Sequence, residues 1–123
     1  MKRILILEYD TALRAAIEHQ LSMKGFDTVA VGDITEGVAH LESNPVDAIW
    51  LDHYLLGKEN GIDFVAKVRS MSTVSKVPIF VVSNSASAEN MRSYMQLGVD
   101  QYYTKTDYDL SQIIADIEYS LTS

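Results

Sequence analysis

Cysteine is absent from the 123-residue chain, and proline occurs only twice. The absence of cysteine excludes disulfide bonds, thiolate catalysis and metal sites built on cysteine. It agrees with a reducing compartment, and we expect a cytoplasmic protein. The hydrophobic runs, such as Ile4 to Leu7 and Ile79 to Val82, are far shorter than the roughly 18 residues of a membrane-spanning helix. We therefore expect neither a membrane span nor a signal peptide.

Basic residues are also scarce. The chain has 10 Lys and Arg against 17 Asp and Glu, a formal net charge of −7, and no basic run. Such a chain lacks the positive surface that nucleic acids and anionic membranes attract, so we expect neither as a direct partner. The hydrophobic content of 47% is that of an ordinary globular protein. The length predicts one domain over residues 1–123.

Short segments rich in Ile and Val recur along the chain and predict five β-strands. Their hydrophobicity is continuous rather than alternating, which indicates burial on both faces, as in a parallel sheet. The predicted strands cover residues 4–7, 28–31, 48–51, 79–82 and 101–103.

Segments with helical periodicity separate these strands. The clearest is the last one, where apolar residues recur at helical spacing at positions 110, 113, 114, 117 and 121. Asp33, Asn60 and Ser87 are placed to begin earlier helices. Tyr94 and Met95 are expected to pack the fourth helix onto the sheet. Strands that alternate with helices predict an α/β domain with a parallel sheet and helices on both faces.

Polar residues follow the predicted strands at the edge where ligands bind in open α/β sheets. They are Glu8, Tyr9 and Asp10 after the first strand, Asp52 after the third, Ser83 after the fourth and Lys105 after the fifth. Clustered carboxylates repel one another unless a cation joins them, and hard oxygen ligands favour Mg²⁺. A hydroxyl and an ammonium group suit phosphoryl oxygens. Because an Asp carboxylate can act as a nucleophile, the set predicts Mg²⁺-assisted formation of an acyl phosphate.

Each of these residues also has a purely structural explanation. Asp52 alone could cap a turn, Ser83 could be a turn residue, and Lys105 could be a surface lysine. Other site classes lack their motifs, because no glycine-rich loop follows the first strand and no Gly-x-Ser-x-Gly sequence is present. The three histidines show no metal-binding spacing, and His53, although next to Asp52, is assigned no role. A flavodoxin-like nucleotide binder remains a weak alternative.

Four motifs, each closing a predicted strand, together resemble the receiver domain of bacterial two-component response regulators. The resemblance covers roughly residues 3–121. The motifs are Ile-Leu-Ile-Leu-Glu8, Ala-Ile-Trp-Leu-Asp52, Val-Pro-Ile-Phe-Val-Val-Ser83 and Gly98-Val-Asp-Gln-Tyr-Tyr-Thr-Lys105. The resemblance implies a flavodoxin-like (βα)5 three-layer fold with a parallel sheet in the order 2-1-3-4-5.

The same resemblance implies a function in signal transduction. Asp52 would accept a phosphoryl group from a histidine kinase or a histidine phosphotransfer protein, with Ser83 and Lys105 contacting phosphoryl oxygens. Tyr102 would be the aromatic residue whose rotamer follows activation. The signal would pass to a downstream effector protein or domain through the fourth helix, fifth strand and fifth helix. The domain would not be an enzyme.

The implied Mg²⁺ site departs from the family pattern. Glu8, Asp52 and the backbone carbonyl of Tyr54 would contact the metal, but Tyr9 stands where the family has a second carboxylate. A neutral phenol is a poor ligand, and we expect a loss of about 1–3 kcal/mol in metal binding. Asp10 could compensate, although a helix cap is its more common role. Tyr9 therefore supports a second hypothesis, a phosphorylation-independent receiver-like interaction module with impaired Mg²⁺ binding.

Overall fold

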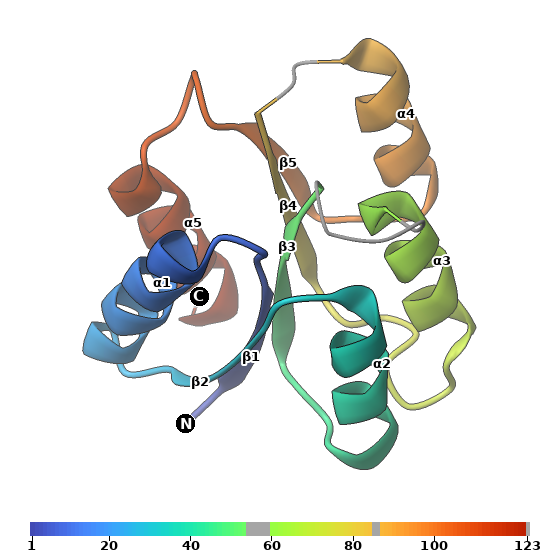
Figure 1. Ribbon diagram of the computed structural model, residues 1–123, viewed down its shortest axis with the longest axis horizontal. Helices are drawn as coiled ribbons and strands as arrows, with labels where there is room; N and C mark the ends of the chain where they lie inside the picture. The colour runs from blue at the N-terminus through green and yellow to red at the C-terminus, as the bar shows by residue number, and fades with distance from the viewer. Residues whose placement is uncertain (54–59, 85–86, 123) are drawn as a thin grey trace.

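The computed structural model describes residues 1–53, 60–84 and 87–122, in which five strands alternate with five helices (Figure 1). The strands are β1 (Arg3–Leu7), β2 (Asp27–Val31), β3 (Ala48–Asp52), β4 (Ile79–Ser83) and β5 (Gln101–Thr104). The helices are α1 (Thr11–Met23), α2 (Ile34–Ser43), α3 (Gly61–Ser70), α4 (Ala88–Gln96) and α5 (Leu110–Thr122). Each strand predicted from the sequence is present and extends one residue further.

The sheet is parallel throughout and has the order β2-β1-β3-β4-β5. This confirms the predicted flavodoxin-like fold. Because β1 and β3 are neighbours with Leu7 opposite Leu51, the residues that follow them lie side by side. The carboxyl ends of β4 and β5 meet the same edge. The topology therefore gathers Glu8, Asp52, Ser83 and Lys105 at one end of the sheet.

Helices cover both faces of the sheet. Figure 1 shows α1 and α5 on one face and α2, α3 and α4 on the other. Successive strand residues point to opposite faces, so each strand feeds two separate apolar clusters. In β3, Trp50 belongs to the cluster under α1 and α5, whereas Leu51 belongs to the cluster under α2 to α4. This alternation decides which layer each residue after β3 can reach.

The predicted helix starts are confirmed by side-chain caps. Asp33 accepts a hydrogen bond from the backbone of Glu36, and Ser87 accepts one from Asn90. Asn60 forms a reciprocal capping box with Asp63 at the start of α3. These caps satisfy backbone N–H groups that have no partner within the first helical turn.

Within the described residues, no helix is long and apolar enough to cross a bilayer.

Candidate functional site

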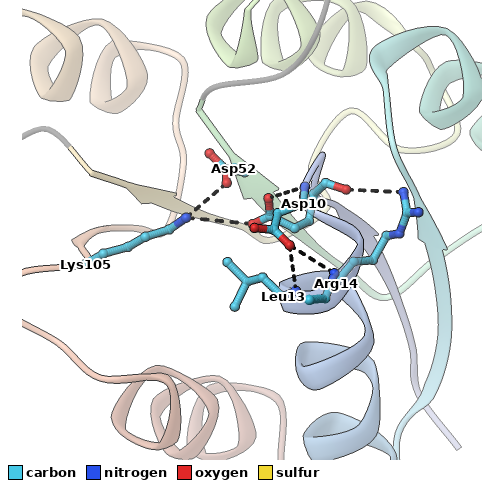
Figure 2. Close-up of polar contacts among 7 residues, drawn as sticks. Asp10, Leu13, Arg14, Asp52 and Lys105 are labelled. Carbon is cyan, nitrogen blue, oxygen red and sulfur yellow. Dashed lines mark hydrogen bonds and ion pairs between the residues drawn. The ribbon is translucent and has the colours of Figure 1, made fainter.

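Lys105 and Asp52 form an ion pair at the carboxyl end of the sheet. Asp52 is 4% exposed at the end of β3, and Lys105 follows β5. The Lys105 Nζ lies 3.1 Å from Asp52 Oδ2 and 3.8 Å from Glu8 Oε1. In Figure 2, Lys105 extends across the site toward Asp52. Two residues 53 positions apart in the chain are thus brought into direct contact.

The turn after β5 holds Lys105 in place. Its backbone N–H donates to the carbonyl of Ser83 at 2.8 Å, which extends the pairing of β4 with β5 by one step. Thr104 is buried, and its hydroxyl donates to Asp107. The Thr104 carbonyl also accepts from the backbone N–H groups of Asp107 and Tyr108. The backbone of Lys105 is therefore fixed, and only the rotamers of its side chain have to be ordered for the amine to reach the site.

Ser83 is fully buried at the end of β4. Val82 is opposite Asp52 in the register of the sheet, and Ser83 is opposite Thr104. The serine therefore lies between the strand that carries the acid and the strand that leads to the lysine. An acid, a hydroxyl and an ammonium group on three adjacent strands can surround the oxygens of a tetrahedral anion.

Glu8 is the second buried acid of the site. Its Oε2 accepts from the backbone N–H of Asp10 at 3.1 Å, while Oε1 has no hydrogen-bond partner in the described part of the chain. Burial raises the pKa of Glu8 to about 7, and the neighbouring Asp52 carboxyl adds to the rise. Two ionised carboxylates against one ammonium leave an excess negative charge, which a bound cation would offset.

Tyr9 and Asp10 do not complete a metal site around Glu8. Tyr9 is 51% exposed. Asp10 confirms the expected cap, because its Oδ1 accepts from the backbone N–H groups of Ala12 and Leu13 at 2.9 and 3.0 Å (Figure 2). Across residues 1–53, 60–84 and 87–122, no group of three or more His, Asp or Glu residues is placed to hold a metal. The predicted ligands present are Glu8 and Asp52, and Tyr54 lies outside the described residues.

Tyr102 lies beneath α4. It is half-buried in β5, and its ring centroid is 5.7 Å from that of Tyr94. Tyr94 is fully buried, as expected from the sequence, but the same expectation is wrong for Met95, which is 50% exposed. The helix turns Met95 to solvent because residues adjacent in a helix point about 100° apart. The predicted switching role of Tyr102 stays a prediction.

His53 is the residue that the sequence analysis missed. It is 5% exposed, and its Nδ1 lies 2.6 Å from the hydroxyl of Tyr94. Burial lowers the pKa of His53 and so favours the neutral ring, although the Asp52 charge acts in the opposite direction. A signal was available in the sequence: a polar residue directly after a strand buried on both faces must find a partner in the covering layer.

The chain is similar in sequence to proteins of a known family. The family model "Response regulator receiver domain" matches residues 4–118. Sensory transduction protein RegX3 of Mycolicibacterium smegmatis is 31% identical over 117 residues, which are 95% of this chain and 49% of that protein. The chain spans about half the length of the curated relatives it matches.

Solved structures agree with the fold. The structure of the phosphorylated cyanobacterial phytochrome response regulator RcpA is 26% identical with a TM-score of 0.81, covering 97% of this chain and 90% of the other. A CheY-like receiver domain protein from Methanospirillum hungatei is 24% identical with a TM-score of 0.88, covering 98% and 94% of the two chains.

Proposed function

Because the chain belongs to the response regulator receiver domain family, we propose that it is a phosphoacceptor in two-component signal transduction. Asp52 accepts the phosphoryl group from a histidine kinase or a histidine phosphotransfer protein. The observation that carries this proposal is the 3.1 Å contact between the Lys105 amine and the buried Asp52 carboxylate. The similarity to RcpA, whose structure is of the phosphorylated form, agrees with it.

The transfer needs little beyond positioning and charge. An Asp52 carboxylate oxygen forms a bond to phosphorus as the phosphorus–nitrogen bond of the donor histidine breaks, and the electron pair stays with the imidazole. Lys105 offsets charge on the phosphoryl oxygens, and the Ser83 hydroxyl donates to one of them. In this proposal residues 1–123 form a single domain. The domain acts as a regulator and not as an enzyme with its own substrate.

Mg²⁺ is part of the proposal, held more weakly than a full set of acids would hold it. Glu8 fits the ion because its buried Oε1 lacks a hydrogen-bond partner among the described residues and its carboxyl faces Asp52. Oxygen ligands of this kind suit a hard divalent cation. The ion would offset negative charge as the phosphoryl group approaches Asp52. The exposed Tyr9 supplies no third carboxylate.

The output belongs to the same proposal. The phosphorylated domain acts in the cytoplasm and presents a changed α4-β5-α5 surface to a downstream effector protein or domain. The contact between Tyr94 of α4 and Tyr102 of β5 supports this choice of surface, because it joins two of its three elements. A population shift between two arrangements of these residues would alter what the partner meets.

Phosphoryl transfer to Asp52 is tested by mass spectrometry after incubation with acetyl phosphate and Mg²⁺, and with candidate histidine kinases. The wild type should gain one phosphoryl mass, and Asp52→Asn should gain none. Asp47→Asn is the matched control, since it alters an exposed Asp just before the amino end of the same strand. An adduct on Asp52→Asn, or none on the wild type from any donor, would contradict the proposal.

The phosphorylation-independent interaction module is the second candidate, and it is motivated by the phenol of Tyr9 at the position of a second acid. The two candidates differ in their response to metal. Trp50 is buried two residues before Asp52, so its fluorescence can report ion binding there. A phosphoacceptor should respond to Mg²⁺ at millimolar concentrations, whereas the interaction module should show neither this response nor an adduct.

A further inference from the structure

His53 leaves β3 on the side of the sheet opposite to Asp52. The two residues are adjacent, and successive side chains of a strand alternate between faces. The backbone N–H of His53 donates to the Val82 carbonyl at 3.1 Å, so the pairing with β4 continues through this residue. Its carbonyl accepts from the N–H of Gly61 at 3.3 Å. His53 therefore connects the backbone at Asp52 to the α3 and α4 layer.

The His53 ring is bonded at both nitrogens to α4. The Asn90 amide donates to Nε2 at 3.3 Å, which leaves the hydrogen on Nδ1, and Nδ1–H donates to the Tyr94 hydroxyl at 2.6 Å. The His53 and Tyr94 rings also meet edge to face with centroids 5.5 Å apart. Asn90 and Tyr94 are four positions apart and so lie on one face of α4. The imidazole cannot turn without breaking both bonds inside a buried layer.

Tyr94 is held from two further directions. A Cβ at position 61 would overlap the Tyr94 hydroxyl, so glycine at the start of α3 is what lets this hydroxyl approach His53. The Tyr94 ring also meets the ring of Tyr102 in β5, with the centroids 5.7 Å apart. Tyr94 therefore joins the end of β3, the start of α3 and the strand that carries the predicted switch residue.

We propose that His53 and Tyr94 are positioning residues that couple the state of Asp52 to α4 through their hydrogen bond. The coupling acts beside the route through Ser83 and Tyr102, and the two routes meet at the Tyr94 ring. This inference rests on the proposed phosphorylation of Asp52. Its consequence is specific: removing the Tyr94 hydroxyl leaves phosphoryl uptake in place and reduces the response of α4.

Hydrogen exchange of residues 88–96, with and without acetyl phosphate and Mg²⁺, measures this response. We expect phosphorylation to change exchange in α4 of the wild type by about fivefold or more. In Tyr94→Phe the phosphoryl mass should still appear, but the change in α4 should fall to less than about half of the wild-type value. Tyr119→Phe is the matched control, because it removes a phenol hydroxyl from an exposed residue of α5.

His53→Asn breaks the same bond from its other end and serves if Tyr94→Phe does not fold. A double-mutant cycle on unfolding adds a readout that needs no phosphorylation, with an expected coupling of about threefold or more in the unfolding equilibrium constant. Additive effects in the cycle, or a full α4 response in phosphorylated Tyr94→Phe and His53→Asn, would overturn the inference. Failure of the proposed function is distinguished by wild-type protein that gains no phosphoryl mass, and it overturns the inference as well.

Discussion

The two sides of the site around Asp52 are built differently. On the side of β4 and β5, the buried Ser83 and the half-buried Lys105 are joined by a backbone hydrogen bond, and the lysine amine contacts Asp52. On the side of β1, Glu8 is the one acid among the described residues that faces the site. Tyr9 is exposed, and Asp10 is engaged at the start of α1. The residues suited to a phosphoryl group are in place, whereas the set suited to a metal ion is reduced.

This difference bears on how the proposed phosphoryl transfer would depend on Lys105 and on a metal ion. Lys105 already offsets one negative charge of the two facing acids, and it does so without a bound ion. The remaining acid, Glu8, is free to hold a proton near neutral pH because burial and Asp52 raise its pKa to about 7. Either a bound proton or a bound cation can therefore offset the negative charge of Glu8 on the β1 side. We expect phosphoryl transfer to depend strongly on Lys105. We also expect that a substitution on the β1 side can increase the affinity for a metal ion.

The largest effect is expected from Lys105→Met. Removing the amine leaves Glu8 and Asp52 facing each other and takes away the cation that would contact the phosphoryl oxygens. Loss of one preorganised group of this kind slows reactions by about 100-fold or more. The rate of phosphoryl uptake from acetyl phosphate measures it, and Lys76→Met, at an exposed lysine, is the control. A rate within about threefold of wild type would show that the β5 side is not the essential one.

The next effect concerns the pH dependence of stability without Mg²⁺. The unfolded pKa of Glu8 is near 4.5 and its folded pKa is about 7, so the folded state binds more protons in between. A raised carboxyl pKa means that stability is highest below the unfolded pKa and falls as pH rises through the folded pKa. The total loss is at most about 3 to 4 kcal/mol, because a change of one in pKa corresponds to about 1.4 kcal/mol.

Glu8→Gln removes this titration and provides the comparison. Urea unfolding of both proteins from pH 5 to pH 8 should show the variant gaining stability relative to wild type as the pH rises. Saturating Mg²⁺ should reduce the difference, because the cation favours the ionised carboxylate. Parallel pH profiles for the two proteins would mean that Glu8 is ionised throughout and that the acids are already balanced.

Tyr9→Asp should strengthen Mg²⁺ binding. An added carboxylate on the β1 side contributes about 1–3 kcal/mol to binding, or about 5- to 150-fold in the dissociation constant. Titration of the Trp50 fluorescence measures the affinity. Tyr9→Phe keeps the aromatic ring without adding a charge and should bind as the wild type does. If Tyr9→Asp leaves the affinity unchanged, position 9 does not face the metal and the comparison between the two sides fails.

Most of the fold could be predicted because its determinants are local. Continuous apolar runs identified all five strands, and Asp33, Asn60 and Ser87 identified helix starts, since cap residues act on the next turn only. The meeting of Lys105 with Asp52 also followed from order alone. Parallel strands end at one edge, so residues at strand ends converge whatever their separation in the chain.

The partners of buried polar residues could not be predicted in the same way. No pattern in the sequence assigned a role to His53, because its partners Asn90 and Tyr94 are on a helix far along the chain and no periodicity records such a contact. The space that Gly61 leaves for the Tyr94 hydroxyl is equally invisible in the sequence. Such contacts depend on the position and orientation of the helices on the sheet, which are determined by tertiary packing and not by the local sequence pattern.

The smallest effect separates the two roles considered for Asp10. Asp10→Ala should lower the free energy of unfolding by about 1 kcal/mol, because the N–H groups of Ala12 and Leu13 lose their acceptor. Asp10→Asn keeps an acceptor oxygen and should lower the free energy of unfolding by only a few tenths of the loss in Asp10→Ala. Its Mg²⁺ dissociation constant should stay within about threefold of wild type, since only a long-range charge is removed. A tenfold weakening in Asp10→Asn would instead make Asp10 a metal ligand, and the β1 side would then hold two acids.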